Sequence, residues 1–482
     1  MNLLSFASQL ASARLRSRKG AGMLDSFAVA AFAGSSGLAL TTMGGVWMFQ
    51  QRRSTLDAQA AANLGIPEFV THSTGDNLAF FALIALAILV VPIFSLGMGA
   101  ARLGAQGRSH RFASLRLLGM TAGEVRRLAL VETCVQFAVG FAIGFILYVA
   151  TLPLWHLVSF GTVPIHMSEM LLPWWLVIAT GAMLALVAAF STLIGLIQVS
   201  ISPLGVSRRA VPLGWAWWRL VIFVVIVVAV AVGARPFMAQ GAGETGVDMK
   251  MVFIAYLVVI LVVLAAMAIV GPFAVQILGR IVLGTRNPAR LIAARRLIGD
   301  PRAAWRNVSG VVLMGMIAAL ITLLAQKPIF SNPATLHIDK SDPHAVSAAY
   351  TELIEADVTK GVLIALAFTL LLGALSTLIQ QASDVFDRAQ EERTLVLVGV
   401  PEKVFASARA QQVLVPFVVL MGIAMGLGAF VAVSSLTSMP LEENEMVLAL
   451  LAGIGVLATL IPVLLTIPLE RRVLAEHQRR ND

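Results

Sequence analysis

The sequence has few of the residues on which soluble enzymes rely. Only 13% of its 482 residues are charged, against roughly 25% in an ordinary soluble domain. The single cysteine, Cys134, excludes a disulfide framework and any zinc site built from several cysteines. The chain also has no Gly-Lys dipeptide, which excludes the GxxxxGK[ST] loop that cradles nucleotide phosphates. A soluble enzyme is therefore excluded, and any ATP that drives this protein must be hydrolysed by another chain.

Apolar residues dominate instead, at 58% of the chain. About 20 apolar residues in a helix cross the hydrocarbon core of a bilayer, where each backbone amide must be satisfied internally. Ten stretches meet this requirement: residues 23–49, 78–98, 134–154, 174–197, 215–233, 251–278, 308–324, 362–379, 413–433 and 446–465. The first is longer than the apolar core of a secretory signal, so we expect an uncleaved span. The predicted fold is an all-α integral membrane protein with about ten transmembrane helices.

Charge alternates between the connections along the chain. Arginines follow spans two, four and six: Arg102, Arg108, Arg111, Arg116, Arg126 and Arg127, then Arg208 and Arg209, then Arg280, Arg286, Arg290, Arg295, Arg296, Arg302 and Arg306. Acidic residues occupy the intervening connections: Asp339, Asp342, Glu352, Glu355, Asp357, Glu442, Glu443 and Glu445. The positive-inside rule then predicts that both termini and the arginine-rich connections are cytoplasmic. Arg52, Arg53 and Arg235 fall on the outer side, where we expect them to snorkel to the membrane edge.

The chain also repeats itself. Residues 115–120 (LRLLGM) match residues 395–400 (LVLVGV), 280 positions later, and Glu132 matches Gln412. Before spans one and seven, Leu10, Ala13 and Arg14 match Leu291, Ala294 and Arg295 at a displacement of 281. Each half carries a GxxxG pair, which allows close helix packing in lipid: Gly140 with Gly144, and Gly422 with Gly426.

Repetition in the same orientation predicts two parallel four-helix units joined by a central helix pair. The expected boundaries are a cytoplasmic elbow segment at 1–22, a first unit at 23–198 and a linker with the central pair at 199–285. A second elbow and unit follow at 286–470, with a cytoplasmic tail at 471–482.

Two connections are longer than a turn requires. Residues 102–132 break at Gly119, and residues 391–412 break at Gly399, where Pro401 suits the first turn of a new helix. We expect each connection to form two short helices across the cytoplasmic end of the bundle. The alternative is a pair of amphipathic helices that only anchor to anionic lipid.

Residues 115–121 (LRLLGMT), followed by Val125-Arg126-Arg127 and Glu132, resemble the signature of the FtsX/MacB-like permeases of ABC transporters. Residues 392–399 (ERTLVLVG) resemble the same motif in its Glu-Arg-led form, and the segments with Arg14 and Arg295 resemble elbow helices. The order of four, two and four spans is similar to that of bacitracin-type exporter permeases. Their large extracellular domain between spans seven and eight has no counterpart in the short segment 325–361.

This resemblance implies that two ABC-type ATPase subunits dock on the cytoplasmic face, bringing the ATP and Mg that this chain does not bind. The coupling residues that it implies are Leu115, Leu118, Gly119, Met120, Thr121, Leu397, Gly399, Val400, Pro401 and Glu402. The chain itself is not expected to be an enzyme. It would export an amphiphilic substrate, such as an antimicrobial peptide, a lipid or a lipophilic drug, by mechanical transmission. The alternative is a transducer that controls an extracellular hydrolase or a sensor kinase without transport.

Few polar residues fall within the spans. We expect Asp25, Glu132 and Gln412 to occupy helix starts, where caps stabilise polar groups. For Glu132 and Gln412 the alternative is a link to the neighbouring coupling segments. The histidines lack metal-ligand spacing, so His156 and His166 are expected on the surface. The acids between spans seven and eight are either solvated charges on a short helical hairpin or a receptor for a cationic peptide. A lipid-linked transferase would need a cluster of acids, histidines or arginines at one interface, and the sequence does not supply one.

Overall fold

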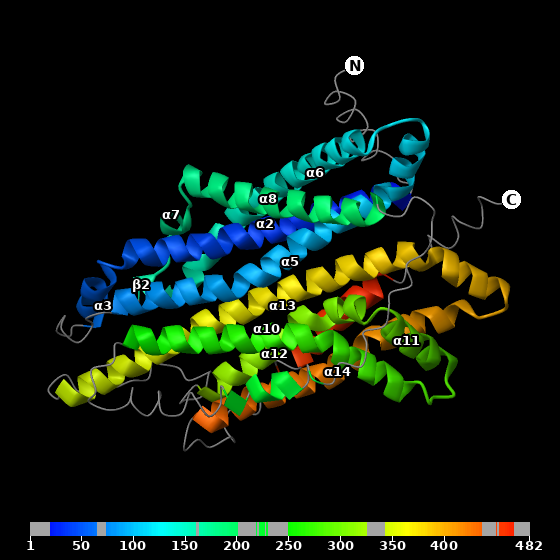
Figure 1. Ribbon diagram of the computed structural model, residues 1–482. Coiled ribbons are helices and arrows are strands. Elements are labelled where there is room, and N and C mark those ends of the chain that lie inside the picture. The colour runs from blue at the N-terminus through cyan, green and yellow to red at the C-terminus, as the bar shows by residue number, and fades with distance from the viewer. Residues whose placement is uncertain are drawn as a thin grey trace. The chain divides into compact units, whose positions relative to one another are not determined.

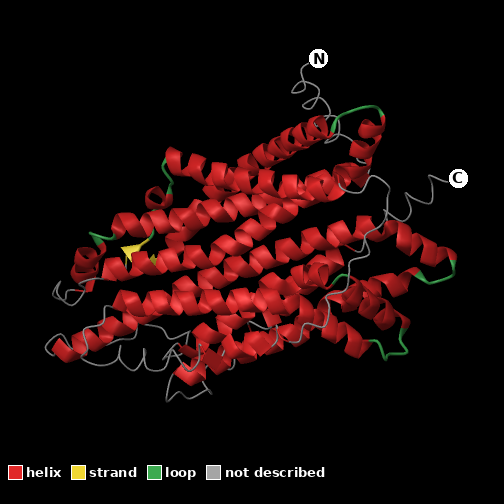
Figure 2. Ribbon diagram, viewed as in Figure 1, coloured by secondary structure: helices red, strands yellow, loops and turns green. Residues whose placement is uncertain are grey.

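A computed structural model describes residues 20–64, 74–160, 163–200, 218, 221–226, 228–229, 249–324, 343–435, 450 and 453–466. Of these residues 91% are in α-helices, and the described sheet is a single two-stranded hairpin (Figure 2). The predicted all-α fold is confirmed. The first elbow segment with Arg14, the C-terminal tail, Arg235 and the acids Glu442, Glu443 and Glu445 lie outside the described residues.

Seven of the described helices are long and apolar enough to cross a membrane: Asp25–Arg52, Thr74–Leu103, Ala122–Leu157, Trp174–Ile194, Leu261–Val282, Ala356–Val385 and Val404–Phe430. They coincide with predicted spans one to four, six, eight and nine. Span ten contains a shorter apolar helix, Gly453–Thr466, and span seven falls within a helix of 24 residues. Span five lies mostly outside the described residues. These helices indicate a multi-pass membrane protein, and the count of ten stays a prediction.

The chain divides into two compact units. Unit 1 comprises Met1–Val206 and Asn332–Phe368, and unit 2 comprises Ser207–Ser331 and Thr369–Asp482. Helix α13 (Pro343–Leu397) is continuous over 55 residues and contributes to both units, and the expected boundaries stay a prediction.

Unit 1 is built on four long helices: α2 (Gly20–Arg52), α5 (Thr74–Leu117), α6 (Ala122–Thr151) and α8 (Trp174–Ser200). Helix α2 packs against α5 and α6, and α8 packs against the same two helices (Figure 1). A short helix, α3 (Leu56–Leu64), follows α2. Following the orientation that the arginines predict, the end of unit 1 with Arg52 is its outer end and the end with Gly119 is its inner end.

An outer hairpin (residues 152–173) joins α6 to α8. It consists of a 3-10 helix, η1 (Leu152–Leu157), strands β1 (Ser159–Phe160) and β2 (Val163–Pro164), and the single-turn helix α7 (Met167–Met170). The antiparallel strands pair Ser159 with Pro164 and Phe160 with Val163. Buried apolar side chains fasten the hairpin to the helices beneath it, among them Leu40, Met48, Tyr148, Phe160 and Ile165.

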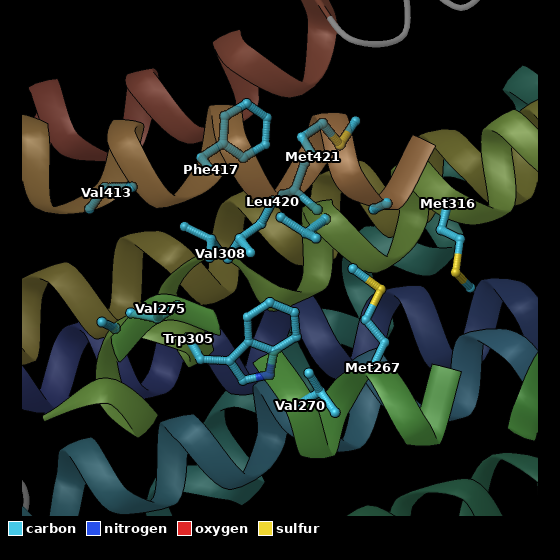
Figure 3. Close-up of a cluster of buried hydrophobic side chains, with 14 of the residues drawn as sticks. Met267, Val270, Val275, Trp305, Val308, Met316, Val413, Phe417, Leu420 and Met421 are labelled. Atoms are coloured by element: carbon cyan, nitrogen blue, oxygen red, sulfur yellow. The ribbon is translucent and has the colours of Figure 1, made fainter. Parts of the chain in front are cut away.

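Unit 2 contains α10 (Met249–Val282), α11 (Pro288–Gly299), α12 (Pro301–Leu324), the second part of α13, and α14 (Glu402–Ser435). Its core joins α10, α12 and α14 through large side chains (Figure 3), including Met267, Trp305, Phe417 and Met421. Glycines make room for them, since Gly271 lies against the Trp305 ring and Gly315 against the Met421 thioether.

The two GxxxG pairs differ in position. A Cβ on Gly144 would lie 2.7 Å from the Ala33 carbonyl oxygen and 2.8 Å from Ser36 Cβ, so the structure places this pair at the contact between α6 and α2. Gly422 and Gly426 are exposed, and a Cβ on either would meet nothing within 4 Å. Among the described residues, the packing predicted for the second pair is not seen. Helix α14 instead buries the face that carries Val413, Phe417, Leu420, Met421 and Ala424. Because successive residues of a helix point about 100° apart, Gly422 and Gly426 point away from this face.

This difference predicts a matched pair of substitutions. Gly144→Leu should overpack the contact between α2 and α6 and lower the unfolding free energy by about 1–3 kcal/mol. Gly422→Leu should leave stability nearly unchanged, because its side chain would enter open space. Thermal unfolding midpoints of the purified protein in detergent measure both effects, and equal midpoints for the two variants would contradict the packing described here.

Candidate functional site

Two helix breaks share one geometry. Helix α5 ends at Leu117 and α6 begins at Ala122, whereas α13 ends at Leu397 and α14 begins at Glu402. Between them, Gly119 and Gly399 each adopt a φ of +99°, a conformation that glycine reaches without the penalty of a Cβ. These breaks are the first tip (residues 117–121) and the second tip (residues 397–401), and they lie 280 residues apart.

Local hydrogen bonds define each tip. At the second tip the Gly399 amide donates to the Val396 carbonyl at 2.9 Å and the Val400 amide donates to the Leu395 carbonyl at 3.1 Å, which is the Schellman pattern of helix termination. At the first tip the Thr121 hydroxyl accepts from the Glu124 amide at 3.3 Å, and the Glu124 carboxylate accepts from the Thr121 amide at 2.8 Å. This reciprocal capping box begins α6.

The helices beside the tips are not short. Helix α5 runs unbroken for 44 residues and α13 for 55, or roughly 66 Å and 82 Å at 1.5 Å per residue. The prediction of short helices across the bundle end is therefore wrong. The sequence has no proline between Pro92 and Pro153 or between Pro343 and Pro401, so no proline ends either helix between those points and Gly119 or Gly399. Each tip is the end of a rigid helical arm longer than the roughly 30 Å of a hydrocarbon core.

Both tips present large apolar side chains to solvent. Leu117 is 90% exposed and Leu118 83%, while Leu397 is 77% and Val398 78% exposed. Gly119, Thr121, Gly399 and Pro401 are also exposed, and Met120 and Val400 are half-buried. Leu115 lies two residues before the end of α5, and Glu402 is the first residue of α14. If this end faces water, as the arginines predict, such adjacent exposed apolar residues mark an interaction surface.

A buried charge triad lies beneath the second tip. The Glu392 side chain, from the Glu-Arg-led motif, is 1% exposed. It accepts from Arg296 Nη2 at 2.9 Å and from Arg409 Nη2 at 3.1 Å. These residues come from α13, α11 and α14, so the triad fastens the predicted elbow helix α11 to both helices of the second tip. A buried carboxylate is tolerated only with such partners.

The first tip has an apolar base instead. Val125, Leu128 and Ala129 of α6 are buried together, with Met120 and Val131 packed against them. The positions 280 residues before Glu392 and Arg409 hold Phe112 and Ala129. The two tips are therefore alike on their exposed surface and different beneath it. Arg409 was not identified from the sequence. The feature that could have indicated it is its charge on the same helix face as the buried Phe405, Ala408 and Gln412.

Three polar residues predicted at helix starts lie inside helices. Glu132 and Gln412 are buried ten residues after the first residues of α6 and α14. Asp25 is buried five residues after Gly20 and accepts from Gln136 Nε2 at 2.8 Å, which joins α2 to α6. These predictions are wrong because the helices begin earlier than the apolar stretches that were taken to define them.

Arg52 does not snorkel. Its side chain is 3% exposed and pairs with Glu169 of α7, with its Nε 3.1 Å from Glu169 Oε1. Its Nη2 also donates to the Pro164 carbonyl at 2.6 Å, so one guanidinium clamps the end of α2 to strand β2 and to α7. The neighbouring Arg53 pairs with Asp76. Sequence reasoning missed the role of Glu169, the sole formal charge between Leu152 and Trp175.

Three of the acids between spans seven and eight, Glu352, Glu355 and Asp357, lie on the long helix α13. Asp357 of α13 is buried and accepts from Lys360 Nζ at 2.7 Å, and Lys360 also donates to the Ser159 carbonyl at 3.2 Å. The Tyr350 and Thr74 hydroxyls are 2.5 Å apart. Asp339 and Asp342 lie outside the described residues.

His156 and His166 are exposed with ring centroids 6.3 Å apart. Within the described ranges, no three His, Cys, Asp or Glu residues are grouped to hold a metal ion.

No family model matches the chain, and no curated protein matches it either. The site is therefore interpreted from its own geometry.

The triad predicts a strong response to neutralisation of its acid. Glu392→Gln should lower the unfolding free energy by about 3–5 kcal/mol, because two buried guanidinium groups lose their counter-charge. Replacement of all three charges, as in Arg296→Met, Glu392→Leu and Arg409→Met together, should restore most of the loss. Thermal unfolding in detergent compares the variants, and a harmless Glu392→Gln would show that the triad does not hold α11.

The clamp on the outer hairpin predicts a pH dependence. Burial raises the pKa of Glu169, but hydrogen bonds from Arg52 and the His166 amide, and the charges of both residues, lower it by more, so the net pKa is below its ordinary value. Stability from a lowered carboxyl pKa is present above the unfolded value of about 4.3 and is lost as the pH falls through the folded value. Glu169→Gln should cost about 2 kcal/mol at pH 7. The difference in unfolding midpoint between wild type and variant should shrink on acidification, and a constant difference would contradict the clamp.

Proposed function

We propose that this chain is the permease subunit of an ABC transporter, with a duplicated FtsX/MacB-like architecture, that couples ATP hydrolysis by separate subunits to export of an amphiphilic substrate. The observation that carries the proposal is the pair of exposed apolar tips, each turned by a glycine at φ +99° at the end of a long helical arm. A chain with two equivalent docking tips fits two copies of one motor subunit.

Three matches at one displacement support the duplication. The helices on both sides of the tips end and begin 280 residues apart. Side-chain exposure also matches at equivalent positions: Leu117 and Leu397 are both exposed, and Val125 and Phe405 are both buried. Equivalent helix positions also hold the buried Glu132 and Gln412. Ten spans in two parallel four-helix units with a central pair follow from this duplication.

The tips suit docking into grooves on two ATPase subunits in the cytoplasm of a bacterium. Leu117 with Leu118, and Leu397 with Val398, supply the apolar anchors. The positive-φ glycines keep the backbone of each tip free of a Cβ close to the partner. ATP and Mg would bind in the partners, because this chain has no phosphate-binding loop.

Helix α13 gives the proposal its transmission element. One end carries the second tip, and the other holds Tyr350 and Lys360 against Thr74 and the Ser159 carbonyl in unit 1. A helix resists compression along its axis because each turn is hydrogen-bonded to the next. Movement of the tip would therefore reach the outer hairpin without a central channel.

The same helix favours a second candidate function. A continuous arm that reaches the outer end can act on an extracellular hydrolase or a sensor kinase as readily as on a substrate. Substrate-stimulated ATPase activity of the purified assembly distinguishes transport from this transducer, in which a hydrolase or kinase copurifies and no substrate stimulates hydrolysis.

Copurification from native membranes tests the docking assignment. The wild-type chain should carry two ATPase subunits, and Leu117→Ser with Leu118→Ser, or Leu397→Ser with Val398→Ser, should each retain one. Both pairs together should retain none, because the anchors of both sites are lost.

The control is Ile281→Ser, which alters an exposed apolar residue at the end of α10 and on neither tip. It should retain two ATPase subunits. Unfolding midpoints should match the wild type throughout, since all five side chains are exposed. Retention of two ATPases by the doubly altered chain, or their absence from the wild type, would overturn the proposed function.

A further inference from the structure

The outer hairpin carries almost no charge. Among residues 152–175, Glu169 is the one formally charged side chain, and it is neutralised by Arg52. Connections on the water side of a membrane protein are normally polar, because they run through solvent. A neutral connection of this length between two spanning helices is therefore unusual and points to a less polar environment.

Backbone groups of the hairpin form hydrogen bonds beyond those between its two short strands, most of them with side chains. The Ile165 amide donates to the Val158 carbonyl at 3.1 Å. Arg52 reaches the Val163 and Pro164 carbonyls, and Lys360 reaches the Ser159 carbonyl. The Tyr148 hydroxyl donates to the Met170 carbonyl at 2.5 Å and accepts from the Leu172 amide at 3.0 Å. Internal partners of this kind are what backbone groups require where water is scarce.

Large apolar side chains project from the hairpin and from the start of α8. Leu157 is 85% exposed and Trp174 76%. The exposed members of this outer apolar face are Leu154, Leu157, Met167, Leu171, Trp174 and Trp175. The face continues onto the exposed Ile146 of α6 and Ile178 of α8, which belong to helices apolar enough to span the membrane. Tryptophan pairs at the end of a span typically lie at the level of the lipid headgroups.

We propose that the outer apolar face is seated in the lipid of the outer leaflet, at the boundary between headgroups and acyl chains. The neutral composition, the satisfied backbone and the continuity with two spanning helices all favour lipid over water or a protein partner. Arg52 pairs with Glu169, the one formally charged residue of the hairpin, so no unpaired formal charge of the hairpin opposes insertion. This assignment is independent of ATP-driven coupling and holds for a transporter or a transducer.

Spin-label accessibility in lipid nanodiscs tests the seat. A label at Leu157→Cys, in a Cys134→Ser background, is compared with labels at Leu118→Cys on the first tip and Leu186→Cys on the exposed face of α8. The ratio of collision with lipid-soluble oxygen to collision with a water-soluble nickel complex should be severalfold higher at 157 than at 118. It should approach the ratio at 186.

The two other outcomes overturn the proposal. High nickel accessibility at 157 would place the hairpin in water, and low accessibility to both reagents would show that protein covers it. A second label at Leu154→Cys repeats the measurement on another turn of η1, and unfolding midpoints equal to the wild type confirm that the labelled chains are folded. The copurification of ATPases plays no part in this test, so either proposal can fail alone.

Discussion

Backbone hydrogen bonding in a low-dielectric medium is the constraint on which the rest of this structure depends. Lipid offers no partner to a free amide or carbonyl, so a span must be helical throughout. The helix continues beyond its apolar stretch where no further proline interrupts it, as α5 does after Pro92 and α13 does after Pro343, until Gly119 and Gly399. Rigid arms with defined ends are the direct consequence, and the outer hairpin meets the same demand with side chains from Arg52 and Tyr148.

The two tips differ in the side chains that lie beneath them. Glu392 holds α11 and α14 together with two guanidinium groups, whereas Val125, Leu128 and Ala129 form an apolar base under the first tip. An ionic attachment fixes geometry more strictly than apolar packing, because its hydrogen bonds are directional. The triad thus ties both helices of the second tip to α11, whereas the apolar base of the first tip is formed by side chains of α6.

Apolar length and glycine spacing predicted the helical class and the positions of both breaks. The spans were readable because about 20 apolar residues have few other uses. The full length of α5 could not be predicted from the sequence. The arginines from Arg102 onward mark the end of the apolar stretch, whereas the helix continues to Leu117. The pairings of Arg52 with Glu169 and of Glu392 with Arg296 and Arg409 join residues 17 to 117 positions apart. Hydrophobic periodicity carries no information on such distant pairs, so they required coordinates.

The proposed function requires that both tips face the same aqueous compartment, where one kind of motor could reach them. Single cysteines at Leu118 and Val398, in a Cys134→Ser background, can be labelled with a membrane-impermeant maleimide in right-side-out and in inverted membrane vesicles. The account predicts that both label only in inverted vesicles. Labelling of the two positions from opposite sides would contradict it.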